Sequence, residues 1–182
     1  MHTVRCLWIG ALLLLAAGCQ KQDADLSKKV LYKGPLLETD NVETLMSDSA
    51  KLQVKLTGPL EQQFENGDML YPKSVKVTFY EKDGKTIKNT LQGNYGKYDK
   101  AKNLYFLRGD VRVKNEEKQQ SLKTEELYYD RLKGTIYTDK FVNILTPAER
   151  LEGYGMTATQ DFSSYTILNV TGVFTVEQPP TP

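Results

Sequence analysis

The stretch that decides the fold is AKNLYFLRGDVRV, residues 101–113. Tyr105, Leu107, Val111 and Val113 share one parity in it, and apart from Phe106 the residues between them are charged or small. Alternation with a period of two, carried by β-branched and aromatic residues, is typical of a half-buried antiparallel strand. The segment therefore predicts one long strand that follows a turn at 100–103.

The same alternation continues outward in both directions. It returns in the runs 75–79 and 135–144, and turn-forming residues separate the runs at 82–85, 115–118 and 131–134. Helical periodicity is scarce. One short helix at 41–50 stays open as an alternative to strand, with a strand expected after it at 50–56. The fold class predicted from these patterns is all-β.

The alternating runs repeat at an offset of 31 residues. Three sets of positions fall in register: Asp99, Asp130 and Asp161; Tyr105, Ile136 and Ile167; Val111, Val142 and Val173. Each unit consists of a strand, a turn that begins at the aspartate, and a second strand. One hairpin cannot bury its apolar face alone, so the hairpins are expected to stack into an elongated body of two facing sheets.

Four quoted stretches carry a family resemblance: AKNLYFLRGDVRV at 101–113, LKTEELYYD at 122–130, IYTDKFVNI at 136–144, and GYGM at 153–156 followed by Asp161-Phe162. Together they resemble the OstA-like β-jellyroll family of lipopolysaccharide transport proteins, and within it the membrane-anchored periplasmic components, the LptC proteins. The resemblance covers about half of the chain, and 36–90 fits it only loosely. It implies a carrier that holds acyl chains of lipopolysaccharide inside an open jellyroll.

The resemblance also implies partners. An inner-membrane ABC exporter would deliver lipopolysaccharide to this chain, and a periplasmic jellyroll bridge protein would receive it edge to edge. The parity of the strands selects the candidate lipid-binding groove: Val75, Val77, Phe79, Leu91, Tyr105, Leu107, Val111, Val113, Ile136, Val142, Ile144 and Ile167. The candidate partner-binding edge is the last β-prone run: Ile167, Leu168, Asn169, Val170, Thr171, Gly172, Val173 and Phe174. Plain core packing explains the inward residues equally well, and a β-rich scaffold that makes only protein contacts stays open.

The first residues predict an address and an anchor. An uncharged run from Cys6 to Gly18 is too short to span a bilayer and is typical of a signal peptide. Small residues precede Cys19 as in a bacterial lipobox, so we expect 1–18 to be removed and Cys19 to be lipidated. Residues 19–35 would form a flexible tether, 36–176 the jellyroll, and 177–182 a disordered tail. The expected location is the periplasmic face, with the inner membrane favoured, although Gln20 leaves the choice of membrane open.

Composition narrows the chemistry. His2, Cys6 and Cys19 are the only histidine and cysteines of the 182 residues. From Gln20 on, the chain therefore lacks the side chains for a structural disulfide, a thiol nucleophile, a Ser-His triad or a zinc site. The 24 basic and 23 acidic residues nearly balance, so the chain lacks the excess of positive charge that is typical of a nucleic-acid-binding protein. We expect no enzyme, cofactor or metal; an enzyme acting on envelope glycans would need two convergent carboxylates, which the sequence does not display.

Overall fold

The computed structural model describes residues 32–175, which contain eleven strands and no helix. The predicted signal peptide, Cys19, most of the tether and the predicted C-terminal tail lie outside these residues. All strands belong to one unit of the chain that begins at Gly34. The strands are β1 (Leu37–Asp48), β2 (Lys51–Gln63), β3 (Met69–Tyr71), β4 (Val75–Tyr80), β5 (Ile87–Gly93), β6 (Tyr95–Asp99), β7 (Leu104–Asn115), β8 (Gln120–Asp130), β9 (Thr135–Leu145), β10 (Glu149–Thr159) and β11 (Tyr165–Thr175).

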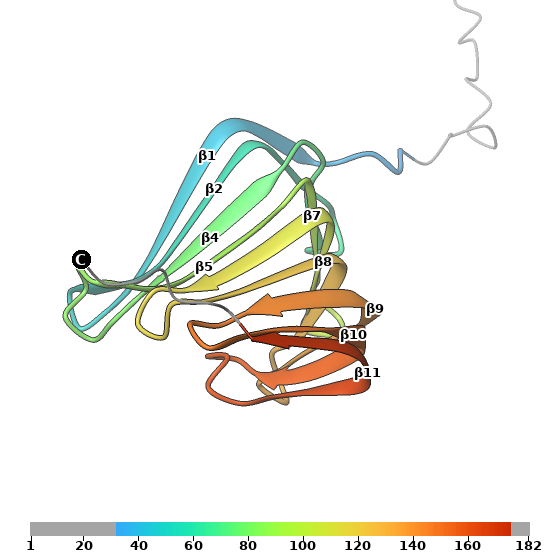
Figure 1. Cartoon of the computed structure of the whole chain (residues 1–182). Coiled ribbons are helices and arrows are strands. Elements are labelled where there is room, and N and C mark those ends of the chain that lie inside the picture. The colour runs from blue at the N-terminus through green and yellow to red at the C-terminus, as the bar shows by residue number, and fades with distance from the viewer. Residues whose placement is uncertain (1–31, 176–182) are drawn as a thin grey trace, which may run out of the picture. The chain divides into compact units, whose positions relative to one another are not determined.

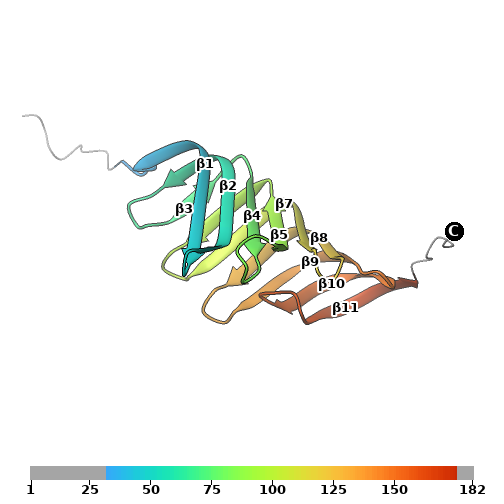
Figure 2. The same ribbon diagram turned by 90° about the vertical axis from the view of Figure 1, so that its left-hand side faces the viewer.

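All pairings are antiparallel, and most join strands that follow one another in the chain. From β7 onward each strand pairs with the next, so β7, β8, β9, β10 and β11 lie in sequence order, as Figures 1 and 2 show. Towards the other end the order is β7, β5, β4, β2 and β1. The predicted all-β architecture of stacked antiparallel hairpins, an elongated β-jellyroll, is confirmed.

Each long strand contributes to two faces of the sheet. On one side of β7, residues 112–115 pair with β5 and residues 104–108 pair with β6. In the same way β2 pairs with β4 through residues 54–57 and with β3 through Gln62 and Gln63. The two facing sheets expected from the sequence are therefore two faces of one hydrogen-bonded sheet. Face A holds β3, β6 and the first half of β7; face B holds β4, β5 and the second half of β7.

The bend between the faces lies at the same level in successive strands. In β7 it falls at Gly109 and Asp110, which both have left-handed backbone angles (φ 78° and 47°) and interrupt the register with β8. Glycine reaches this region without steric cost, and aspartate tolerates it better than most residues. Register shifts near Thr124 in β8 and at Gly153 to Met156 in β10 continue the line. The two glycines of β10, Gly153 and Gly155, lie at these shifts.

The core lies between the two faces. Its most deeply buried side chains are Leu127, Met156, Val111 and Val142, each less than 2% exposed. Val111 and Val142 occupy one repeat position, and Leu127 and Met156 come from the neighbouring strands β8 and β10. The repeat thus places successive hairpins over a continuous core.

The repeated aspartates open the turns at the end of face A. Asp99 accepts a hydrogen bond from the backbone N–H of Lys102, and Asp130 accepts from those of Leu132 and Lys133. These contacts replace the backbone bonds that a reversing chain loses, which explains the aspartate in each copy. The helix left open at 41–50 is wrong. Residues up to Asp48 continue β1, and from Val42 to Asp48 each of them pairs with a residue of β2.

Candidate functional site

The main hollow of the interior is an apolar cavity of about 280 Å³ in the N-terminal half of the jellyroll. It is lined by Met46, Val54, Leu56, Tyr71, Val75, Val77, Phe79, Leu91, Gly96, Lys97, Tyr105, Phe106, Leu107, Tyr129, Arg131 and Gln160. The face-B wall is aliphatic apart from Phe79, since β2, β4 and β5 alternate apolar residues inward. We call this cavity the groove.

Stacked aromatic rings form part of the face-A wall. Tyr105 stacks on Tyr98 with ring centroids 4.5 Å apart and on Tyr129 at 5.8 Å. The three residues are direct cross-strand partners on β6, β7 and β8. Aromatic pairs of this kind stabilise neighbouring strands while their faces remain available for apolar contact. Burial raises the pKa of both Tyr105 and Tyr129, so these two side chains are neutral at neutral pH.

A buried tyrosine lies in the wall nearer the N-terminal end. The Tyr71 hydroxyl donates a hydrogen bond of 2.6 Å to Glu61 Oε2. Burial, and then this bond to a carboxylate, raise the pKa of Tyr71, because both disfavour the phenolate. Tyr71 therefore acts as a neutral donor that satisfies Glu61, and the pair shows no sign of acid–base chemistry.

Polar side chains lie at the rim of the groove. The Arg131 side chain is exposed and lies close to Tyr105, and Gln160, which follows β10, lines the same cavity. In the described part of the chain, no ion pair joins Arg131 to an acid, whereas the neighbouring Lys133 pairs with Asp130 at 3.2 Å. An apolar pocket with an uncompensated cation at its mouth suits an amphiphile that has an anionic headgroup.

The C-terminal half of the interior is packed. A space of only about 20 Å³ lies there, lined by Val113, Asn115, Gln120, Ser121, Leu122, Ile144, Met156, Phe162 and Tyr165. This is about the volume that holds one water molecule. The two halves of the interior therefore differ in kind: one is an open groove and the other a closed core.

The structure divides the twelve inward residues predicted from the sequence between these halves. Val75, Val77, Phe79, Leu91, Tyr105 and Leu107 line the groove. Val111, Val113, Ile136, Val142 and Ile144 are buried in the core, and Ile167 packs against it. Sequence reasoning missed Val54, Leu56, Tyr71 and Tyr129 of the groove wall. Alternation at Leu52, Val54 and Leu56 carried the signal for β2, but it lies outside the repeat.

The predicted partner-binding edge lies entirely on β11. Within the described residues this strand pairs only with β10, so its outer backbone edge is open. Its side chains are unusually exposed for apolar residues: Leu168 is 65% exposed, Val170 56%, Val173 60% and Phe174 53%. At the other end, β1 pairs only with β2. Both ends are thus templates on which a further strand can pair.

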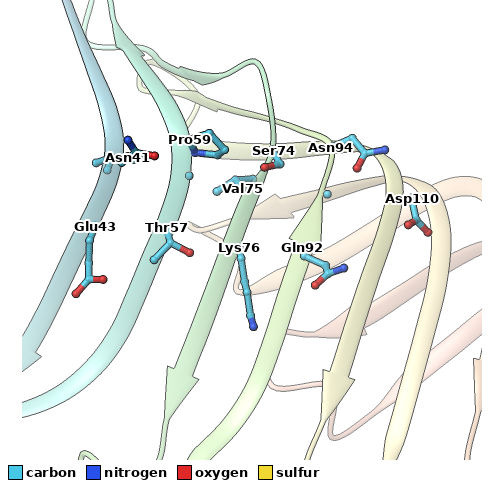
Figure 3. Close-up of a pocket in the computed structure, with 13 residues that line it drawn as sticks. Asn41, Glu43, Thr57, Pro59, Ser74, Val75, Lys76, Gln92, Asn94 and Asp110 are labelled. Atoms are coloured by element: carbon cyan, nitrogen blue, oxygen red, sulfur yellow. The ribbon is translucent and has the colours of Figure 1, made fainter.

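A hollow of about 480 Å³ on the outer surface, where the strands bend, has different chemistry. Figure 3 shows Asn41, Ser74 and Asn94 along the bend and Lys76 and Gln92 below them. The polar lining of this hollow does not suit acyl chains. In residues 32–175 no group of three acidic, histidine or cysteine side chains could hold a metal ion. The same residues contain no helix long and apolar enough to cross a membrane.

Comparison with known proteins gives one family. The chain matches the family described as "Lipopolysaccharide-assembly, LptC-related" over residues 5–175. A search of curated proteins returned no match. The matched region includes all eleven strands, and therefore both the groove and the open edge of β11.

Proposed function

The chain belongs to the LptC-related family of lipopolysaccharide-assembly proteins, and from this premise we propose that it binds the acyl chains of lipopolysaccharide in the groove and passes the lipid on through β11. The family implies a role in lipopolysaccharide transport and a periplasmic location associated with the inner membrane. The receiving partner would be a periplasmic jellyroll bridge protein, and the delivering partner an inner-membrane ABC exporter. The observation that carries the proposal is the apolar groove with its cationic rim.

Burial of the acyl chains would supply the binding energy. Each methylene transferred from water to an apolar wall contributes about 0.8 kcal/mol. The face-B residues Val54, Val77 and Phe79 and the tyrosine rings opposite them offer such a wall. No acid, base or metal is needed for this step. Burial stabilises the bound lipid but gives its movement no direction. Transfer therefore requires a next site of comparable apolarity and an energy source upstream.

Two open edges suit the handover. A jellyroll partner that adds a strand to β11 would extend both faces, and its interior would continue the interior of this domain. Val170 and Val173 of β11 are exposed, although their cross-strand partners Gly153 and Leu151 face the interior. A strand added to β11 would also cover these two exposed apolar side chains. Lipidation of Cys19 would hold the domain at the membrane; this residue lies outside the described part of the chain.

Two adjacent aromatic residues of β4 provide a matched test. Phe79 lines the groove, whereas Tyr80 lies near Lys55, which forms an ion pair with Glu43 on the outer surface. A photoreactive phenylalanine analogue would replace each in turn, in cells that depend on this chain. We expect a lipopolysaccharide adduct at Phe79 and none at Tyr80. Adducts at neither site, with the protein folded and at its normal level, would refute the groove and favour a scaffold that makes protein contacts only.

A further inference from the structure

The turn at 160–164, between β10 and β11, crosses from one face of the jellyroll to the other. Asn89 of β5 and Asn115 of β7, both on face B, each donate a hydrogen bond of 3.5 Å from Nδ2 to the backbone oxygen of Asp161. The Lys118 ammonium donates to the backbone oxygen of Ser163 at 3.2 Å. The turn therefore joins the two faces on the side opposite the bend.

This turn differs from the two equivalent turns of the repeat. Lys100, Arg131 and Phe162 occupy the same position, one residue after the repeated aspartate. Lys100 and Arg131 are exposed, but Phe162 packs against the core. Phe162 also has a left-handed backbone angle of 54°, which is uncommon for a bulky residue. The third turn is thus folded inward where the other two point outward.

The inward turn divides the interior. Gln160, at its start, lines the groove, and Phe162 lines the small space of about 20 Å³ in the packed half. Tyr165, the first residue of β11, lines the same small space. An acyl chain in the groove would meet this turn before it could continue along the interior towards β11.

The asparagine contacts that join the turn to face B are weak, whereas the turn itself is held by hydrogen bonds of ordinary length, such as that from Phe162 N–H to the Thr159 oxygen at 2.9 Å. Both amide bonds to Asp161 are at the long limit for a hydrogen bond, and Asn89 Oδ1 is buried without a partner. A buried acceptor that lacks a donor costs free energy in the closed state. The strained Phe162 backbone adds to that cost. Several contacts thus favour the closed state, while the unpaired acceptor and the strained backbone reduce the free energy needed to open it.

We propose that the 160–164 turn is a gate, in which Phe162 forms the end wall of the lipid site and leaves the core when an acyl chain advances towards β11. This inference rests on the proposed function, and in it Phe162 positions the lipid by closing the end of the groove. In the closed state the lipid occupies only the N-terminal groove. In the open state the space around Val113, Ile144 and Met156 joins the groove.

A reversible clamp tests the gate without touching the core. Lys118 and Ser163 are both exposed, and residues from Gln20 on contain no cysteine. Lys118→Cys and Ser163→Cys in the full chain would be bridged by a bis-methanethiosulfonate, with the two single-cysteine variants as controls. Lipopolysaccharide adducts would be measured in cells at a photoreactive analogue in place of Phe79, and separately in place of Tyr165.

The clamp should leave the Phe79 adduct unchanged and lower the Tyr165 adduct at least about tenfold, since it removes the open population. Reduction of the bridge should restore it. An unchanged Tyr165 adduct under the clamp, with the Phe79 adduct present, would overturn the gate alone. Absence of the Phe79 adduct without the clamp would overturn the proposed function, and the gate with it.

A second variant acts in the opposite direction. Phe162→Ala removes the end wall and should raise the Tyr165 adduct relative to the Phe79 adduct. Phe64→Ala is the matched control, because Phe64 is also a partly buried phenylalanine beside a turn, between β2 and β3. A Phe162→Ala protein that folds but shows no rise at Tyr165 would contradict the assignment of the wall.

Discussion

Replacing Gly153 with alanine should weaken the pairing of β11 with β10. A Cβ atom at this position would lie 2.4 Å from the backbone oxygen of Asn169 and 2.6 Å from Ile167 Cγ2. Carbon–oxygen contacts in sheets settle near 3.3 Å, so β10 and β11 would have to separate by about 0.9 Å. The backbone oxygen cannot rotate away as the end of a flexible side chain would.

The cost of this separation should be about 1–3 kcal/mol, the usual range for overpacking. It should appear locally, because β11 is an edge strand with one neighbour and opens more readily than the central strands. At tenfold for every 1.4 kcal/mol, amide exchange in β11 should accelerate about 5- to 150-fold, and exchange in β7 should change little. Binding of a jellyroll partner to the β11 edge should weaken in parallel.

Hydrogen-exchange mass spectrometry on β11 and β7 measures the effect directly. Gly93→Ala is the matched control. Gly93, the last residue of β5, is buried like Gly153, but its added Cβ would meet nothing closer than 3.4 Å. Equal exchange of β11 in the wild type, the Gly93 variant and the Gly153 variant would refute the reasoning. It would mean that the bulge at Gly153 absorbs the methyl group without moving β11.

Three further predictions test the two halves of the interior and its rim. Val142→Ala should lower the free energy of unfolding by about 2–3 kcal/mol because Val142 is fully buried, whereas Val77→Ala, beside the groove, should lower it by about 1 kcal/mol. Denaturant unfolding compares the two variants, and equal losses would argue against an open groove. Arg131→Glu should weaken lipopolysaccharide binding about tenfold, and Lys133→Glu, with the same charge change, should not. Hydrogen bonds from Ser163 and Thr159 lower the pKa of Asp161 to about 2, so its carboxylate stabilises the 160–164 turn above about pH 4. This stabilisation should be lost as the pH falls through 2. The turn amides should then lose protection relative to the exchange rate of an unfolded chain at the same pH, and Asp161→Asn should show no such change.

The parity of the strands and the 31-residue repeat were enough to predict the fold class and the side that each residue faces. They did not separate groove from core. Leu107 and Val111 have the same pattern in the sequence and are both buried, yet of the two only Leu107 lines the groove. Parity determines which face a side chain lies on. The space between two faces depends on the angle of the bend and on the contacts at the mouth, which come from residues far away in the chain.

The groove wall from β2 was missed for a related reason. Val54 and Leu56 alternate as clearly as the later strands, but no repeat partner marks them and the resemblance to known jellyrolls was loose in that region. The structure brings them opposite Tyr105 through the pairing of β2 with β4 and β3. These pairings join segments that the sequence pattern treats as separate hairpins.

The difference between the open and packed halves has a local origin in the repeat. The first two turns place a cation after the aspartate, and long side chains such as Lys100 and Arg131 reach solvent from there. In the third turn the same position holds Phe162, which gains apolar contacts by turning inward and brings the backbone within reach of Asn89 and Asn115. One aromatic residue in a repeated position thus converts an open end of a stacked scaffold into a closed one. The boundary between groove and core should therefore move when residue 162 is changed, and it should stay in place when the equivalent residues of the other two turns are changed.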